Sequence, residues 1–191
     1  MTARPVYPKG RKSARKTLYF HALGNVVEWK KRSDKSDFER RIATMIELNT
    51  FKKILEENEE RLPLLTLDEF FNGNTAEDSI APNQWGFGRP TLSEIWDMLQ
   101  KIALMPNIAW VRVSLHYDTE IVENDGNEVL NLAGDTIVLC TTILPAELEK
   151  LVNCEWLCCD GVITIKASEL NTYSCVPPIP ENFDCLEIVW D

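Results

Sequence analysis

The sequence predicts a single α+β domain, in which a mixed or antiparallel sheet of five or more strands packs against three to four helices. Three observations lead to this prediction. Some stretches place apolar residues at helical spacing, others alternate apolar and polar residues as strands do, and the two kinds do not alternate strictly along the chain. With 191 residues, 45% of them hydrophobic, the chain is long enough to bury one core.

The clearest pattern begins at Thr91. Thr91 and Glu94 have the spacing of a capping box, the reciprocal side-chain to backbone pair that starts many helices. Apolar residues then recur at helical spacing: Leu92, Ile95, Trp96, Leu99 and Ile102. After Pro106 the period becomes two, and Val111, Val113, Leu115 and Tyr117 alternate with Arg112, Ser114, His116 and Asp118. We therefore expect a helix, then a strand with one buried face and one face in water.

The N-terminal quarter of the chain is basic. Residues 1–16 hold six lysines and arginines and no acid, which predicts a flexible basic arm, so the folded domain is expected over residues 17–191. A hairpin is expected within residues 17–30. Apolar residues from Phe38 to Leu55 keep helical spacing until Pro63, and a break at Asn49-Thr50 is left open. A capping-box pair precedes that helix at Ser36 and Glu39.

The middle of the chain contains a long loop. A further capping-box pair, Thr66 and Glu69, predicts a short helix over residues 67–71. Residues 72–90 follow with no periodicity, and loops of this length in compact domains are usually either functional or mobile. Trp85 lies within this loop, and two interpretations remain open: a binding loop, or a tryptophan that fills a gap in the core and anchors the loop.

The last third predicts further strands and one more helix. The expected elements are a hairpin with an acidic tip over residues 119–132, a strand over 135–142, a helix over 145–152, strand pieces over 155–159 and 161–166, and a final strand over 185–190. Because strands and helices do not alternate strictly along the chain, a mixed or antiparallel sheet is favoured.

The charge is unevenly distributed. The net charge is −10, but residues 1–61 carry +6 and residues 62–191 carry −16. An acidic surface repels nucleic acids and membranes and attracts cationic partners. The sequence also lacks an apolar run of the roughly 20 residues that a membrane helix needs. No signal peptide is expected, because the basic start is followed by charged residues instead of an apolar segment. We therefore expect a cytoplasmic protein that does not bind membranes and whose acidic part, residues 62–191, does not bind nucleic acid.

No metal, cofactor or catalytic set is predicted. The six cysteines lie in the last third, and Cys154, Cys158 and Cys159 lack the spacing of a zinc site, so reduced thiols are expected. His116, Asp118 and Glu120 would share one strand face, but a single histidine with two carboxylates fits a solvent-facing strand better than a metal centre. Nucleotide-binding and hydrolase motifs are absent from the sequence.

Several segments together resemble a known class of proteins. They are residues 79–86, residues 90–92, residues 110–113 with His116 and Asp118, and residues 185–191. They resemble small acidic bacterial immunity proteins of polymorphic toxin and contact-dependent inhibition systems. The resemblance implies a cytoplasmic protein that binds and neutralises one cognate toxin domain, often a cationic nuclease. The predicted partner-binding residues are Trp85, His116, Asp118, Glu120, Glu123, Asp125 and Glu128.

Two other functions remain open from the sequence. One is a small cytoplasmic enzyme of hydrolase type, with a site near His116 and the loop that carries Trp85. The other is a nucleic-acid binder acting through the basic arm, which lacks interleaved aromatic residues for stacking on bases.

Overall fold

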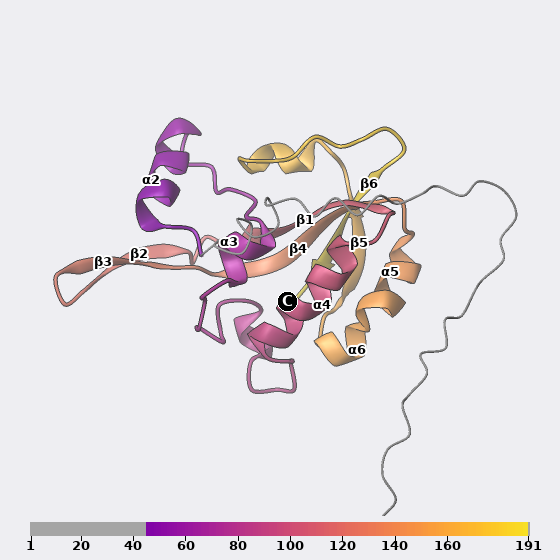
Figure 1. The fold of residues 1–191 in the computed structure, drawn as a ribbon, viewed down its shortest axis with the longest axis horizontal. Coiled ribbons are helices and arrows are strands. Elements are labelled where there is room, and N and C mark those ends of the chain that lie inside the picture. The colour runs from indigo at the N-terminus through magenta and orange to yellow at the C-terminus, as the bar shows by residue number, and fades with distance from the viewer. Residues whose placement is uncertain (1–44, 191) are drawn as a thin grey trace, which may run out of the picture.

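The computed structural model describes residues 45–190 of the chain. The expected basic arm, the hairpin within residues 17–30 and the first part of the helix expected from residue 38 lie outside the described residues. The described part is an α+β fold built on an antiparallel sheet, with a long two-stranded ribbon that projects from one side (Figure 1). The predicted α+β class is therefore confirmed.

The strands form two sheets instead of one. The main sheet has the order β1-β4-β6-β5, with all neighbours antiparallel. Its strands are β1 (Ile108–Leu115), β4 (Gly134–Thr141), β6 (Asp184–Val189) and β5 (Gly161–Ile165). The ribbon pairs β2 (Glu120–Asn124) with β3 (Asn127–Asn131). The prediction of one sheet with five or more strands was wrong, because two of the six described strands pair only with each other.

Five α-helices occur in residues 45–190, where three to four were expected. They are α2 (Leu48–Glu57), α3 (Leu67–Phe71), α4 (Leu92–Ala103), α5 (Pro145–Val152) and α6 (Cys154–Leu157). None of these helices has the length and apolar character needed to cross a bilayer. Both described capping boxes are confirmed, because Thr66 and Thr91 each exchange bonds with the glutamate three residues later.

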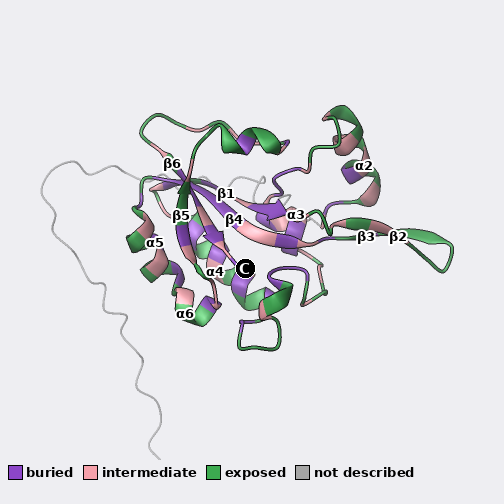
Figure 2. Ribbon diagram, turned by 180° about the vertical axis from the view of Figure 1, so that it is seen from behind, coloured by how far each residue is buried: buried purple, intermediate pink, exposed green. Residues whose placement is uncertain are grey.

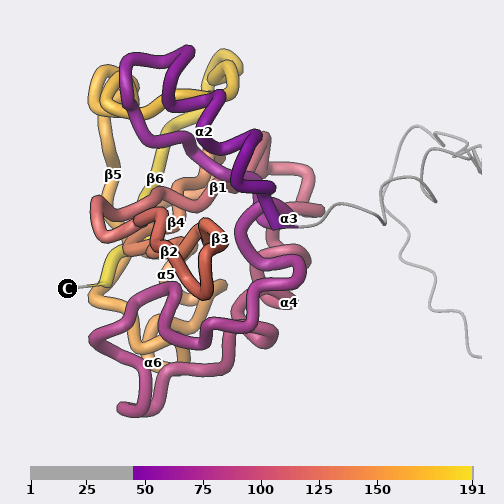
Figure 3. Tube along the Cα trace, turned by 90° about the vertical axis from the view of Figure 1, so that its left-hand side faces the viewer, coloured from indigo at the N-terminus to yellow at the C-terminus, as the bar shows by residue number. Residues whose placement is uncertain are grey.

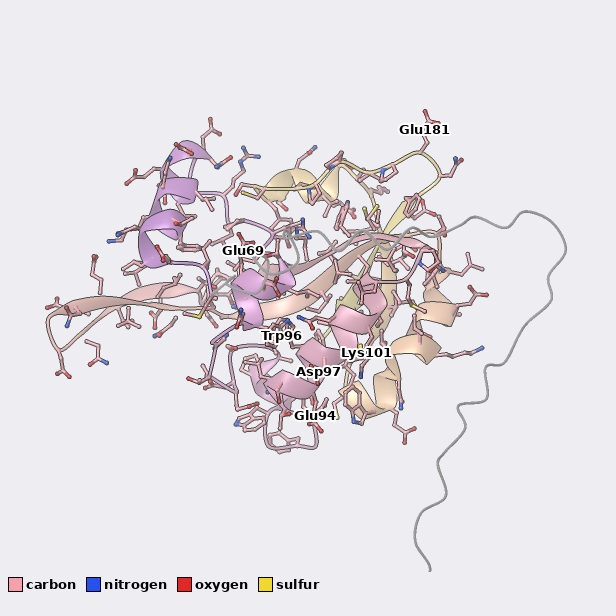
Figure 4. All side chains as sticks on the ribbon, in the orientation of Figure 1. Glu69, Glu94, Trp96, Asp97, Lys101 and Glu181 are labelled. Atoms are coloured by element: carbon pink, nitrogen blue, oxygen red, sulfur yellow. The ribbon has the colours of Figure 1, made fainter. Side chains whose placement is uncertain are left out.

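The core lies between the sheet and helices α3, α4 and α5, where Figure 2 shows the buried residues. Ile95 and Leu99 of helix α4 are fully buried in this core. Its other side is polar, and Glu94, Asp97 and Lys101 are exposed there (Figure 4). Burial of one apolar face is what stabilises a helix of this length, so the amphipathic pattern and the packing agree.

The helix expected over residues 38–55 does not extend through residues 45–47, since α2 begins only at Leu48. The Met45 N–H instead donates to Asn72 O at 2.6 Å, and the Ile46 N–H donates to Glu69 O at 2.9 Å. These two bonds attach the segment to the end of α3 and bury Ile46. Tertiary hydrogen bonds therefore replace the helical ones that the local spacing predicted.

The face of β1 that was expected in water is covered. Trp110 and Ser114 are buried on it, within a second apolar cluster formed by Leu64, Trp110, Val138, Cys140, Leu170 and Cys185. The segment that precedes β6 supplies the cover: Ser114 Oγ donates to Tyr173 Oη at 2.9 Å, and Trp110 Nε1 donates to Pro178 O at 3.0 Å. The sheet is thus packed on both sides.

The predicted strand over residues 155–159 is also wrong, because α6 occupies this stretch. Asn153 starts the helix with a left-handed backbone conformation (φ 54°), and its Oδ1 accepts the Trp156 N–H at 3.3 Å. Asparagine tolerates this conformation better than most residues, and it is a favoured N-cap. The short helix leads into β5 at Gly161, as expected.

Partial burial of Glu187 on the covered face predicts a pH effect on stability. Desolvation by burial, with smaller contributions from Asp135 and Glu169, raises the pKa of Glu187 above its ordinary value of 4.5. The folded state therefore favours the protonated form, and stability is lost as the pH rises through the raised pKa.

Glu187→Gln should raise the melting temperature at pH 7, and this gain should shrink as the pH falls from the raised pKa toward 4.5, below which both states are protonated. Glu181→Gln is the matched control, because Glu181 is exposed on the loop before β6 (Figure 4). Thermal melts at several pH values measure the difference. A gain that does not depend on pH would contradict the prediction.

Candidate functional site

The β2–β3 ribbon is the most prominent surface feature, and Figure 3 views the molecule with the ribbon toward the reader. Asp125 and Gly126 form its tip with positive φ angles of 51° and 78°, which suit the right-handed twist of a two-residue hairpin turn. The register pairs Val122 with Val129 and Glu123 with Glu128. The expected hairpin with an acidic tip is therefore confirmed.

The acidic side chains of the ribbon lie on two sides, and not on one face. Cross-strand partners share a face, so Glu123 and Glu128 lie on the same side as Leu130, which is buried against the core. Glu128 is also 2.6 Å from Lys52 of α2. Glu120 is three residues before Glu123 on β2, and successive side chains of a strand point to opposite faces, so Glu120 lies on the other side of the ribbon. A partner that contacted every acid would have to enclose the ribbon.

The expected alignment of His116, Asp118 and Glu120 on one strand does not occur, because β1 ends at Leu115. The chain turns at His116, whose N–H donates to Ala133 O at 2.8 Å. Within the turn, His116 Nδ1 lies 3.2 Å from the Asp118 backbone N and 3.2 Å from Asp118 Oδ2. The turn thus places His116 and Asp118 next to each other at the base of the ribbon. Glu120 is instead the first residue of the ribbon strand β2.

Tyr117 is the residue of this turn that sequence reasoning missed. It was expected in the core but is 83% exposed, and its ring centroid lies 3.7 Å from that of His116. Exposed aromatic rings beside charged residues are frequent anchors of protein interfaces. The polar run that surrounds Tyr117 in the sequence was the available signal that the strand had ended.

Trp85 does not fill a gap in the core, because its side chain is 40% exposed. The guanidinium of Arg89 lies 5.0 Å from its ring centroid. Arg89 itself is buried; its Nη1 donates to Pro90 O at 2.9 Å and its Nη2 donates to Glu77 O. Burial lowers the pKa of Arg89, and the nearby Glu77 and Asp78 oppose this effect. Arg89 therefore fixes the loop, and the interpretation of this segment as a binding loop stays a prediction.

Two cavities flank the turn at the base of the ribbon. One, of about 510 Å³, is bounded by Met45, Asp78 and Asp118 together with residues 130–133. The other, of about 350 Å³, is lined by His116, Asp118 and Asp135. Pro82 and Ala133 belong to both walls. The structure therefore brings His116 close to the loop of residues 72–90, as the enzyme alternative required.

Comparison with known proteins assigns the chain to a family. Residues 46–188 match the family described as the Uncharacterized protein YfbO family. The chain belongs to the YfbO family. The match covers all the described helices and strands apart from Val189, the last residue of β6. No curated protein and no solved structure matches this YfbO-family chain.

The cysteines of the YfbO-family chain are free thiols in the structure. Cys140 and Cys185 face each other in the register of β4 and β6, and burial raises the pKa of Cys140 to about 12. Burial also raises the pKa of Cys159, with a further contribution from Cys154. Within residues 45–190 no group of three or more histidine, cysteine or acidic side chains could hold a metal ion.

We expect six titratable thiols after unfolding and no stoichiometric zinc in the purified YfbO-family chain. The reason is that raised pKa values keep Cys140 and Cys159 protonated near neutral pH, whereas zinc binds thiolates. Elemental analysis and a thiol count under denaturing conditions measure both quantities. One zinc per chain, or four thiols instead of six, would contradict the prediction.

Proposed function

We propose that this chain is an immunity-type protein that binds and neutralises a cognate, cationic toxin domain in the cytoplasm. The observation that carries the proposal is the ribbon, which projects from the body (Figure 1). Glu120, Glu123 and Asp125 are exposed on it. Within the described residues, one ion pair, between Lys52 and Glu128, offsets part of the negative charge of the ribbon. A protruding element of one charge sign is suited to entering a basic cleft.

The charge of the rest of the body supports the same function. Residues 62–191 hold 21 acidic and five basic residues. Of the five basic residues, Arg89 is buried and Arg112 is partly buried, so neither offsets the acidic surface fully. A net negative field speeds association with a cationic protein by long-range attraction. A nuclease is the favoured toxin class, because its active site is built to attract the phosphate charges that such a ribbon imitates.

Tyr117 supplies the apolar anchor that an interface of this kind needs. It lies at the base of the ribbon, next to Asp118, whose side chain is 67% exposed. Interfaces typically place an aromatic anchor at the centre and charges at the rim. We therefore place the centre of the interface at Tyr117 and its charged rim along the ribbon, and Trp85 remains a candidate for a second contact.

The test is co-expression with the C-terminal domain of the protein that the neighbouring gene encodes. The wild-type chain should restore growth and co-purify with that domain, and the association rate should fall as salt is added. A variant with Glu120, Glu123 and Asp125 changed to the neutral amides keeps the side-chain shapes and should bind more slowly. Binding that ignores both salt and these substitutions would remove the support for this function.

A hydrolase-like enzyme is the second candidate, and one observation favours it. His116 and Asp118 form a histidine–carboxylate pair beside the cavity of about 350 Å³. Such a pair can act as a general base. The described residues that line this cavity include no serine, threonine or cysteine, so the base would have to activate water. Hydrolysis of ester or phosphodiester test substrates that His116→Ala abolishes would favour the enzyme.

A further inference from the structure

Two cysteines, one at each end of helix α6, lie side by side. The Cys158 N–H donates to Glu155 O at 3.4 Å, and the Cys159 N–H donates to Cys154 O at 3.1 Å. With Cys158 in the left-handed conformation (φ 54°, ψ 35°), these bonds form a Schellman motif. In this motif the residue after the left-handed one commonly packs on the residue whose carbonyl it binds. The Cys159 side chain is therefore brought against that of Cys154.

The geometry of this pair fits a disulfide. Standard bond lengths on either side of the 3.1 Å contact keep the Cα atoms of Cys154 and Cys159 less than about 7 Å apart, the limit for bridging two cysteines. Burial raises the pKa of Cys159, and a hydrogen bond between its thiol and that of Cys154 adds to this effect. Cys158 lies toward the long loop instead, because a Cβ added at Gly88 would be 3.9 Å from its Sγ. The pair is thus Cys154 with Cys159.

Access from solvent separates this pair from the other facing pair of thiols. Cys140 and Cys185 are directly opposite in the register of β4 and β6, and their thiols are also hydrogen-bonded to each other. They are only 0% and 3% exposed, whereas Cys154 and Cys159 are partly exposed at the rim of the main core. A dissolved reagent can therefore reach the pair on α6, while the pair in the sheet is protected.

We infer that Cys154 and Cys159 form a reversible disulfide when the chain meets a low-molecular-weight disulfide, so that α6 carries a modification site. The Cys154 thiolate attacks one sulfur of the small disulfide, breaks its S–S bond and releases one small thiol. The Cys159 sulfur then displaces the second small thiol from Cys154. The chain loses two electrons, which reduce the small disulfide, and two protons, which leave with the two small thiols. Cys159 reacts second because its raised pKa keeps it protonated.

The bond would join the first residue of α6 to the segment that leads into β5. Helix α6 spans Cys154–Leu157, and β5 begins at Gly161. A cross-link across this turn prevents α6 from unwinding by itself and restricts the unfolded chain. The oxidised chain should therefore melt a few degrees higher than the reduced chain.

Oxidation of the full, initially reduced chain with excess glutathione disulfide tests the inference. After free thiols are alkylated and the monomer is isolated, trypsin should release both cysteines of the pair in one peptide, residues 151–166. This peptide should have lost two hydrogen atoms in mass. The exposed Cys175 should carry glutathione, which shows that the reagent has reacted. Cys140 and Cys185 should remain thiols that react only after unfolding.

Serine variants identify the bonded pair. Cys158→Ser should keep the link, whereas Cys154→Ser and Cys159→Ser, made separately, should abolish it and leave the remaining partner as a mixed disulfide with glutathione. A thermal melt of each reduced variant checks the fold.

The inference is overturned if Cys175 carries glutathione while Cys154 and Cys159 stay unlinked, or if the link requires Cys158. It is also overturned if the pair in the sheet oxidises as readily, or if links form only between molecules. No toxin partner takes part, so failure of the proposed function would leave this result unaffected.

Discussion

Phe70→Ala should lower the free energy of unfolding by about 3–5 kcal/mol, the range for removing a fully buried phenylalanine. Phe70 is 0% exposed and lies at the junction of α3 and the sheet. Its ring meets Phe71 edge to face at 4.9 Å and lies directly over Gly134, where an added Cβ would be 3.1 Å from Phe70 Cζ. The Phe70 ring occupies the space that a side chain at position 134 would otherwise fill. Because Gly134 has no side chain to replace the ring, truncation of Phe70 leaves a cavity.

Denaturant unfolding of the wild type and the variant measures this loss. Phe87→Ala is the matched control: the same atoms are removed from a side chain that is 81% exposed, so the change should stay within about 0.5 kcal/mol. A loss below about 1 kcal/mol for Phe70→Ala would show that α3 does not seal the core. The opposite change, Gly134→Ala, should also destabilise the protein, because the new methyl group has no free space.

Tyr117→Ala should weaken binding of the cognate toxin domain about 30-fold or more, mainly through faster dissociation. Truncation of a central aromatic anchor typically costs about 2–4 kcal/mol of binding free energy, and each 1.4 kcal/mol is tenfold. The effect should be on binding alone, because a side chain that is 83% exposed contributes little to folding. Surface-based kinetics with the purified toxin domain would separate the two rates, and a thermal melt would confirm the fold.

The charges of the ribbon should behave differently from the anchor. Reversing Glu123 and Asp125 to lysine should slow association and weaken its salt dependence, since rim charges act mainly on the encounter rate. Trp85→Ala tests the other aromatic candidate on the same partner. A larger loss for Trp85→Ala than for Tyr117→Ala would move the centre of the interface to the loop of residues 72–90. If neither Tyr117→Ala nor Trp85→Ala weakens binding, the interface has no aromatic anchor and the interface as proposed is contradicted.

The elements that local chemistry decides were predicted well. The capping boxes at Thr66 and Thr91 are formed, and the hairpin around Asp125 has the expected acidic tip. Pro145 starts α5 where its missing N–H costs nothing, and the helix runs over the expected residues. In each case the signal lies within a few residues, so sequence spacing alone is sufficient.

The features that distant contacts decide were not predictable in this way. The polar side of β1 suggested water, but residues far along the chain cover it, and Ser114 finds its partner in Tyr173. Residues 45–47 fitted a helical pattern, yet they bond to the end of α3. The sequence pattern indicates which side chains are apolar, but it does not indicate which distant segment packs against them.

The candidate site was predicted in part. The acidic ribbon and the proximity of His116 to the long loop follow from the sequence pattern and are present in the structure. The division of the acids between two sides, and the exposure of Tyr117, depend on where β1 ends and how the ribbon turns away from the sheet. Because β1 ends at Leu115, the alternation of buried and exposed side chains does not continue to Tyr117.

The ribbon has a consequence for self-assembly. Within residues 45–190, β2 and β3 pair only with each other, so each strand leaves an outer edge of unpaired N–H and C=O groups. Such edges are templates on which a second copy can add a strand. Glu123 directly opposite Glu128 weakens the pairing within one ribbon slightly, but it makes the approach of an identical ribbon far less favourable. The same carboxylates that would attract a basic protein therefore keep copies of the chain apart.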